Sequence, residues 1–345
     1  MSFFKKTYDF VAIGDITTDA FIKLKEANVN CDINEEHCTI SMKFGDKIPY
    51  QSVDIVSAVG NAPNAAVSAS RLGINSALVT NIGSDQNGKD CLRVLEKERV
   101  SHKYISVHKG FATNYHYVLW YEKDRTILVK HHEYEYNLPD IGSPKWLYLS
   151  SLGPSTREYH KKIAGFLKKH PNTKLAFQPG TFQMSLGTDE LKDIYSRTEI
   201  FFCNDEEAER ILGKPTGTNI KELLLGINNL GPKSVVITMG PKGAYGLDTR
   251  PTKQGQSFGR ETGIYFAPAF NPEEPAFERT GAGDAFASAC TSALLLGKTL
   301  PTAMSWGAVN GMSVCRYVGA QKGLLTQGEI EYELSKKPDY KVSAI

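Results

Sequence analysis

The stretch of sequence that decides the fold reads Glu278-Arg279-Thr280-Gly281-Ala282-Gly283-Asp284-Ala285-Phe286. A run of small residues follows it, and this run predicts a long helix over 287–296. The two glycines around Ala282 allow a tight turn and leave several backbone N–H groups without partners where the helix begins. Together with the positive end of the helix dipole, these donors predict a binding site for an anion.

Asp284 stands just inside the first turn of this predicted helix. A carboxylate beside an anion site could accept a proton from an attacking hydroxyl, while the backbone N–H groups stabilise phosphoryl oxygens. Taken alone, the same pattern is also typical of a plain turn with an acidic residue that satisfies the helix dipole. The rest of the chain must therefore decide between a catalytic base and a structural residue.

The bulk properties are those of an ordinary globular enzyme. The 345 residues suffice for one large α/β domain or two medium ones, and 41% of them are hydrophobic. The 40 basic and 38 acidic residues give a net charge of +2, which offers no argument for a nucleic-acid or membrane partner. The longest nearly apolar run, 286–296, is too short to cross a membrane, and no signal peptide is apparent. We therefore expect a cytoplasmic protein.

The six cysteines form no CxxC pair and lie mostly in apolar runs, as reduced cysteines of a cytosolic protein do. Cys31, His37 and Cys38 are close in the sequence, but their spacing does not fit a zinc site and no second pair exists. We expect no metal site at this position.

Strand-like and helix-like segments alternate over much of the chain, which predicts a parallel sheet with helices on both faces. The expected strands are 10–13, 77–82, 146–149, 174–177, 200–203 and 234–238, and the expected helices include 65–72, 206–212, 220–230 and one near Asp189. Two stretches of alternating polar and apolar residues, about 22–58 and 112–136, do not fit this rhythm and predict a small separate sheet. We expect one domain over 1–345, an α/β/α sandwich of three layers whose mostly parallel central sheet carries this β-sheet lid.

Five further motifs accompany the 280–284 turn, each of which alone is a common turn or helix cap. In chain order they are Gly14-Asp15-Ile16-Thr17-Thr18-Asp19, Gly60-Asn61-Ala62-Pro63-Asn64, Gly83-Ser84-Asp85-Gln86-Asn87-Gly88, Asn204-Asp205-Glu206-Glu207 and Thr238-Met239-Gly240-Pro241-Lys242-Gly243. Their order and spread over nearly the whole chain resemble the PfkB family of carbohydrate and nucleoside kinases, the ribokinase-like enzymes. The turn at 280–284 resembles this family's DTxGAGD signature.

The resemblance implies a role for each matching position around the acceptor. Asp284 would be the catalytic base, and the backbone of Gly281, Ala282 and Gly283 would hold the phosphoryl group. Asp19 would bind two substrate hydroxyls. The remaining substrate-binding residues would be Thr17, Gly60, Asn61 and Asn64.

The same resemblance implies a nucleotide site and its cofactors. Asn204 and Glu207 would organise Mg²⁺ through water molecules. Asn204, Thr238, Gly240 and Gly243 would line ATP, and the helix 303–315 would flank its adenine. A monovalent cation such as K⁺ is a further candidate cofactor, and the lid strands would pair across a homodimer.

The chain departs from the family pattern at four places, and two of them, Thr17 and 178–181, leave the substrate open. Glu278 and Arg279 replace Asp and Thr, Val59 replaces a glycine, Thr17 replaces a more usual Asn, and 178–181 reads Gln-Pro-Gly-Thr in place of a common Asp-Pro-Asn. The acceptor is therefore either a sugar hydroxymethyl group, as in ribokinase and fructokinase, or a nucleoside of the adenosine or guanosine type. Aromatic residues in 115–121, with His131 and His132, could stack on a nucleobase or could form the lid core and dimer contacts.

Other classes of protein fit less well. The segment 226–234 is close to a Walker A motif, but Pro232 interrupts it and a strand follows. A Rossmann dehydrogenase would need GxGxxG after the first strand, where this chain has none. A non-catalytic sugar or nucleoside sensor on the same fold would be favoured by loss of the base or the anion site, and both are present.

Overall fold

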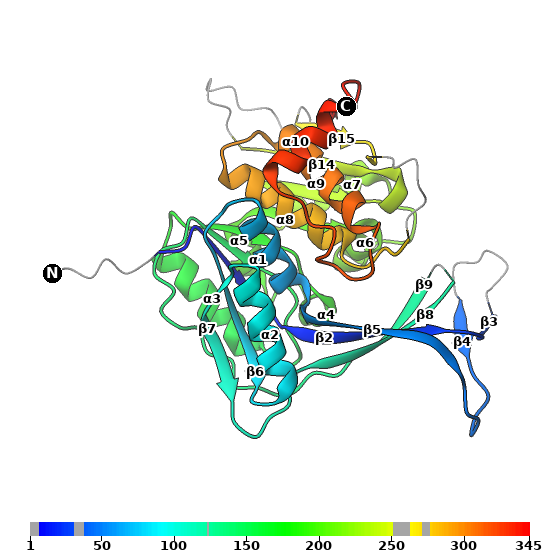
Figure 1. The fold of residues 1–345 in the computed structure, drawn as a ribbon. Coiled ribbons are helices and arrows are strands. Elements are labelled where there is room, and N and C mark those ends of the chain that lie inside the picture. Colours follow the sequence, from blue (N-terminus) through cyan, green and yellow to red (C-terminus); the bar gives the residue numbers. More distant parts are fainter. Residues whose placement is uncertain (1–6, 31–37, 123, 251–262, 271–276) are drawn as a thin grey trace.

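The computed structural model describes residues 7–30, 38–122, 124–250, 263–270 and 277–345 (Figure 1). Within them the main body is built on a ten-stranded sheet with the order β16-β15-β14-β13-β12-β11-β10-β1-β6-β7. Its strands are β1 (Phe10–Ile13), β6 (Ser76–Gly83), β7 (Ser101–His108), β10 (Trp146–Leu149), β11 (Lys174–Phe177), β12 (Thr198–Asn204), β13 (Ser234–Thr238), β14 (Ala244–Asp248), β15 (Ile264–Ala267) and β16 (Ser343–Ala344).

The strands from β7 to β13 are parallel, and β14 to β16 continue the sheet antiparallel. Parallel strands need crossover connections, and helices provide them along the sheet. The segment 226–234 ends a helix and enters β13, as expected for a chain without a P-loop. The mostly parallel central sheet is thus confirmed.

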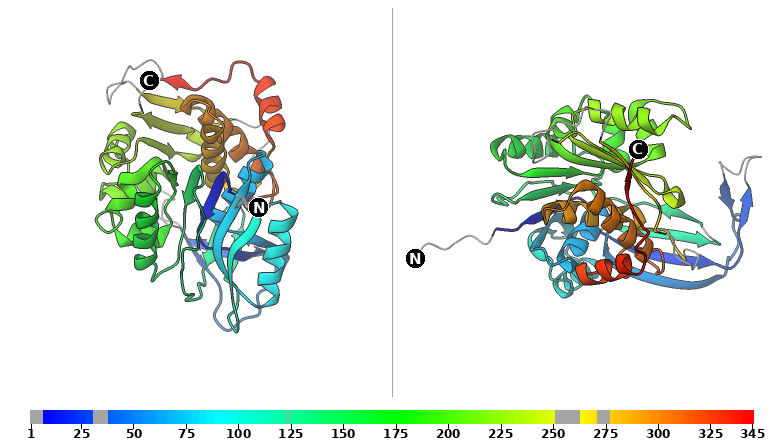
Figure 2. Two further views of the ribbon diagram at one scale, coloured as in Figure 1. Left: turned by 90° about the vertical axis from the view of Figure 1, so that its left-hand side faces the viewer. Right: turned by 90° about the horizontal axis from the view of Figure 1, so that it is seen from above.

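Helices cover both faces of the sheet, as the two turned views in Figure 2 show. One face carries α1 (Asn61–Arg71), α2 (Gln86–Lys97), α8 (Ala282–Leu295), α9 (Leu300–Val314) and α10 (Gln327–Ser335), and the other carries α3 (Arg157–Lys169), α5 (Lys192–Arg197), α6 (Asp205–Leu212) and α7 (Ile220–Asn229). Side chains alternate along each strand, so Phe10 and Ala12 join one core while Val11 and Ile13 join the other. The short helix α4 (Thr181–Leu186) precedes α5, and Asp189 lies between them, not inside a helix.

A separate four-stranded sheet, called the lid below, extends from the body as a long arm (Figure 1). It has the order β5-β2-β8-β9, formed by β2 (Thr17–Leu24), β5 (Tyr50–Val59), β8 (Tyr115–Tyr121) and β9 (Asp124–Leu128). A small ribbon of β3 (Asn28–Asn30) and β4 (Thr39–Ser41) lies at its far end (Figure 1). The lid sheet begins at Thr17, before the expected residue 22, because β2 follows β1 after a short turn.

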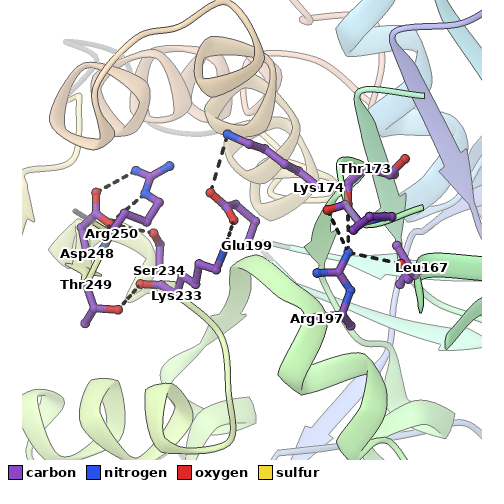
Figure 3. A network of polar contacts seen from close by, with 11 residues as sticks. Leu167, Thr173, Lys174, Arg197, Glu199, Lys233, Ser234, Asp248, Thr249 and Arg250 are labelled. Atoms are coloured by element: carbon purple, nitrogen blue, oxygen red, sulfur yellow. Dashed lines mark hydrogen bonds and ion pairs between the residues drawn. The ribbon is translucent and has the colours of Figure 1, made fainter. Parts of the chain in front are cut away.

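Polar contacts hold the sheet at the amino ends of its parallel strands (Figure 3). Glu199, at the start of β12, pairs with Lys233 at 2.9 Å and Lys174 at 3.6 Å, and Asp248 binds Arg250 at 2.7 Å. These groups secure neighbouring strands at the edge opposite the carboxyl ends. Open parallel sheets bind ligands at the carboxyl ends of their strands, and the candidate site lies at that edge.

Cys91, Cys203 and Cys290 are buried free thiols, and Cys315 is a half-buried one. Cys38, near the end of the lid, is disulfide-bonded, so the expectation of reduced cysteines holds for the body of the protein and not for the lid. Cys31 and His37 lie outside the described residues. Among the described helices none is both long and apolar enough to cross a membrane.

Candidate active site

A cavity of about 410 Å³ lies between the carboxyl ends of the central strands and the inner face of the lid. Its lining includes six residues expected from the sequence to bind substrate or to act as base: Thr17, Asp19, Gly60, Asn61, Asn64 and Asp284. These residues come from the lid strand β2, from the start of α1 and from the start of α8. The fold therefore brings together groups that are up to 267 positions apart in the chain.

Asp284 lies in the first turn of α8 and is almost fully buried. Its Oδ1 accepts hydrogen bonds from the side-chain amides of Asn61, at 2.7 Å, and Gln178, at 3.0 Å. Its Oδ2 accepts a bond of 2.8 Å from the amide of Asn64. Both oxygens are thus held by neutral donors at the base of the cavity.

Burial raises the pKa of Asp284 above the ordinary value, because removal from water disfavours the charged form. Hydrogen bonds from Asn64, Gln178 and Asn61 act in the opposite direction, since each favours the carboxylate, and the Arg125 guanidinium adds to them. A carboxylate whose pKa is raised toward neutrality is better suited to accept a proton from a hydroxyl. The environment of Asp284 is thus compatible with the expected role of general base.

The turn before α1 places the two asparagines that hold Asp284. Gly60 has φ +118°, and a Cβ at this position would lie 2.7 Å from the carbonyl oxygen of Asp15, so only glycine fits. Val59, which stands where the family pattern has a glycine, needs no such freedom, because it ends β5 opposite Thr17. The amide of Gln321 donates to Asn64 Oδ1 at 3.0 Å and fixes the orientation of that side chain.

The expected anion site is only partly open in this structure. Gly281 adopts φ +80°, and the N–H of Ala282 donates to the carbonyl of Arg279 at 3.3 Å. A Cβ on Gly283 would meet nothing within 4 Å, so free space adjoins the backbone there. The start of α8 therefore offers room for a ligand beside Gly283, while the N–H of Ala282 is bonded within the turn.

Gln178 follows β11 and was noted in the sequence only as a departure from the family pattern. Its Oε1 accepts a hydrogen bond from the hydroxyl of Tyr148, a fully buried residue, and its Nε2 donates to Asp284. Burial raises the pKa of Tyr148 far above its ordinary value, with a further contribution from Asp284, so the phenol remains a donor. Tyr148 therefore fixes which end of the Gln178 amide faces the carboxylate.

The lid side of the cavity carries two pairs of a carboxylate and an imidazole. Asp19 Oδ1 lies 3.4 Å from Nδ1 of His116, and Asp15 Oδ2 lies 3.4 Å from Nδ1 of His131. The two imidazole rings meet edge to face, with centroids 5.5 Å apart. Thr17, expected to contact substrate, donates its hydroxyl to the carbonyl of Asn114 at 3.1 Å.

Asp15 is held in place from the body of the protein. Its Oδ2 accepts the backbone N–H of Gly153 at 2.7 Å, and its Oδ1 accepts the hydroxyl of Tyr136 at 2.8 Å. Burial and the neighbouring Asp15 raise the pKa of Tyr136, so this phenol stays protonated and donates. Asp15 and His116 were not among the expected site residues, and His131 was expected only as a residue that could stack on a nucleobase. The only signals were their positions in a motif and in an aromatic-rich segment.

Asn204 and Glu207 form a capping box at the start of α6. Asn204 Oδ1 accepts the N–H of Glu207 at 2.7 Å, and Glu207 Oε2 accepts the N–H of Asn204 at 2.9 Å. Burial raises the pKa of Glu207, and repulsion from Asp284 adds to the shift. Glu207 is therefore close enough to the site to interact electrostatically with Asp284. Its side chain is a carboxylate, and oxygen ligands of this kind are the ones that Mg²⁺ prefers.

The described residues contain no cluster of three or more His, Cys, Asp or Glu that could hold a metal by itself. Mg²⁺ commonly keeps several waters and uses one or two carboxylates together with substrate phosphates, so a lone Glu207 with Asn204 fits such a weakly held ion.

Thr238, Gly240 and Gly243 stand at the carboxyl end of β13, where Thr238 pairs with Asn204 of β12. A Cβ on Gly243 would lie 2.4 Å from the carbonyl oxygen of Ala267, and its φ is +101°, so this position requires glycine. A Cβ on Gly240 would meet nothing within 4 Å. None of these three residues is part of the cavity lining.

Known proteins place this arrangement in a family. Residues 22–327 match the pfkB family of carbohydrate kinases. The chain is 27% identical over 331 residues to an ATP-dependent 6-phosphofructokinase of Thermoanaerobacterium thermosaccharolyticum, covering 91% of this chain and 90% of the relative. It is 26% identical to a 5-dehydro-2-deoxygluconokinase of Bacillus subtilis, covering 95% and 96%.

Solved structures show the same fold. Ribokinase of Arabidopsis thaliana, complexed with ribose and ATP, superposes with a TM-score of 0.73 at 19% identity, covering 95% of this chain and 99% of that one. A nucleoside kinase of Methanocaldococcus jannaschii gives 0.72 at 18% identity, covering 96% and 100%. The fold and the family match define a phosphotransferase that uses ATP and an alcohol group as acceptor. The chain belongs to the pfkB family of carbohydrate kinases.

Proposed function

We propose that this sugar kinase transfers the γ-phosphoryl group of ATP to a hydroxymethyl group of a sugar, with Asp284 as the base. The observation that carries the proposal is the buried carboxylate of Asp284 at the base of the cavity, held by Asn61, Asn64 and Gln178 at the start of α8. A primary hydroxyl that reaches this carboxylate would lie beside the free space at Gly283.

Chemical steps follow from these positions. Asp284 orients the hydroxyl and takes its proton, and the backbone at the start of α8 binds the transferred phosphoryl oxygens. The helix dipole of α8 and the backbone donors require no reorganisation as charge develops. Mg²⁺, where bound, neutralises the phosphate charge, and Glu207 with Asn204 would hold it through water.

A nucleoside acceptor is the alternative within the same reaction. Of the residues that the sequence suggested for stacking on a base, His131 lines the cavity, while Tyr115, Tyr117, Trp120 and Tyr121 do not; Phe21, His116 and Phe182 also line it. The rings of Tyr115 and Tyr117 pack against each other, with centroids 5.2 Å apart. The tyrosines and the tryptophan of 115–121 therefore offer a nucleobase no surface in the cavity, which favours the sugar.

ADP release tests the proposal directly. The full chain is assayed with ATP, Mg²⁺ and a panel of ribose, fructose, 2-keto-3-deoxygluconate, fructose 6-phosphate, adenosine, guanosine and cytidine. We expect substrate-dependent ADP release with at least one sugar. Faster turnover of a nucleoside than of every sugar would favour the alternative acceptor, and no turnover of any compound would contradict the kinase mechanism.

We also propose that two copies associate through the outer face of the lid. Asp19 and His116 face the cavity, so the alternate residues of the same strands point away from it. Ile55, Tyr117 and Leu128 stand in register across the lid through Ala20, and all three are exposed. A contiguous apolar surface of this kind is typical of an interface.

A further inference from the structure

The charge of the cavity wall distinguishes between classes of acceptor. Of the described residues that line the cavity, three carry carboxylates, Asp15, Asp19 and Asp284, and two carry imidazoles, His116 and His131. None of those lining residues is Lys or Arg. With all three carboxylates ionised, the lining carries three negative charges when both imidazoles are neutral and one net negative charge when both are protonated. In neither state is the wall positive.

The guanidinium of Arg125 is already in an ion pair. Arg125 of the lid lies 3.7 Å from Glu278, whose carboxylate is almost fully buried. The following residue, Arg279, is exposed. An acceptor with its own phosphate or carboxylate would therefore lie against three lining carboxylates, without a lining cation to offset the repulsion.

The same wall contains polar atoms that need partners. Asp19 Oδ1, His116 Nε2 and His131 Nδ1 are buried and have no hydrogen-bond partner among the described residues, and Asp19 is more than nine-tenths buried. A buried polar atom left without a partner costs stability, so a ligand that supplies one is favoured. Sugar hydroxyls both donate and accept, and they can satisfy a carboxylate oxygen and an imidazole nitrogen together.

We infer that the acceptor is a neutral polyhydroxylated molecule, and that the pairs Asp19–His116 and Asp15–His131 each bind hydroxyl groups of it. This inference rests on the proposed kinase function and narrows it. It excludes sugar phosphates and sugar acids as preferred acceptors, although relatives of the chain are described as acting on such compounds. His131 and Asp15 act here as specificity-determining residues.

Fructose and fructose 6-phosphate form a matched pair for the test. For the wild type we expect kcat/KM to be at least about tenfold higher for fructose than for fructose 6-phosphate, and the phosphate should be only a weak competitive inhibitor. The same ratio should hold for any other neutral sugar compared with its own phosphate. His131→Asn should raise KM for the neutral sugar about tenfold and change kcat by less than about twofold, because the pair binds the sugar and takes no part in proton transfer.

The Asp15→Asn variant distinguishes an electrostatic role of Asp15 in substrate preference from a purely structural role. Removing one negative charge should narrow the preference for the neutral sugar over its phosphate by about threefold or more, whereas a merely structural role would weaken both alike. His102→Asn, a substitution at an exposed histidine of β7, is the control and should leave the ratio unchanged. Circular dichroism and thermal melting confirm that each variant is folded.

The possible outcomes distinguish failure of the inference about a neutral acceptor from failure of the proposed kinase function. Turnover that is faster with the sugar phosphate or sugar acid would overturn the inference and leave the kinase mechanism standing. Equal effects of Asp15→Asn on both compounds would also overturn it. Absence of ADP release with every compound, neutral or charged, would contradict the proposed function itself.

Discussion

Arg125 Nη1, on lid strand β9, lies 3.7 Å from Oε1 of Glu278, just before the turn that begins α8. The same oxygen of Glu278 accepts the backbone N–H of Thr280 at 2.7 Å. Beside this pair, the rings of Trp120 and Phe277 meet edge to face with centroids 5.4 Å apart. The lid thus contacts the segment that leads into the predicted phosphoryl-binding turn through an ion pair and an aromatic contact.

A double-mutant cycle tests whether this ion pair couples the lid to catalysis. With Arg125→Met and Glu278→Gln, we expect a coupling energy of about 1 kcal/mol in kcat/KM, because the pair is largely shielded from water. The exposed pair Lys161–Glu158, changed in the same way, is the control and should show additive effects. Additive losses at Arg125 and Glu278 would mean that the pair does not couple the lid to the site.

Asp284→Asn should lower kcat by about a hundredfold or more, because the amide cannot accept the proton of the attacking hydroxyl. Binding of the sugar should persist, since the lid wall is untouched. Steady-state ADP release gives kcat, and titration calorimetry gives sugar affinity. Asp339→Asn, at an exposed aspartate, should behave as wild type. Near-normal turnover of the Asp284 variant would remove it from the role of base.

The cradle around Asp284 could be anticipated because its residues lie in short motifs whose order resembles that of the PfkB family. That resemblance implied one site for Asn61, Asn64 and Asp284, although Asn61 and Asn64 follow a lid strand and Asp284 follows a segment after the antiparallel strand β15. The capping pattern at Asn204 and Glu207 was also visible locally, and the structure shows that cap. Its role in holding a metal stays a prediction.

The histidines of the lid could not be anticipated in the same way. His116 stands opposite Asp19 because β8 pairs with β2 in parallel, across 97 positions of chain. No local pattern specifies which strand is the neighbour or in what register, and a shift of one residue would turn His116 to the other face. Gln178 was missed for a similar reason, since its contact with Asp284 depends on how β11 meets α8.

The pH dependence of the reaction should report the raised pKa of Asp284. Activity needs the carboxylate, so kcat/KM should fall on acidification at a pH above the range where an exposed aspartate titrates. Gln178→Glu replaces a donor with a negative charge, and both changes disfavour the ionised form of Asp284. We expect the acidic limb of kcat/KM to move up by about one pH unit or more.

The control for this profile is Gln86→Glu, an exposed position on α2, which should leave the acidic limb in place. If the acidic limb of kcat/KM in the Gln178→Glu variant stays in place or moves to lower pH, the titrating group is not Asp284.

Alanine substitutions at Gly281 and Gly283 compare a glycine that the backbone conformation requires with one that adjoins free space. Gly281→Ala should destabilise the fold by about 1–3 kcal/mol, because φ is +80° and the new Cβ would lie 2.2 Å from that of Ala320. Gly283→Ala should be neutral or raise Tm, since nothing lies within 4 Å and alanine favours the helix. The added methyl group should still lower kcat, because it occupies the space proposed for the phosphoryl group. An unchanged kcat would mean that the phosphoryl group binds elsewhere.

The proposed association through the lid predicts a concentration-dependent dimer that a charge on the outer face abolishes. Ile55→Lys or Tyr117→Lys should give a monomer in light scattering after size exclusion, because a buried unpaired ammonium is costly at an apolar interface. Tyr332→Lys, at an exposed aromatic on α10, is the matched control and should leave the dimer intact. A wild-type chain that is monomeric at high concentration would contradict the proposal, and so would a dimer that survives both lid substitutions.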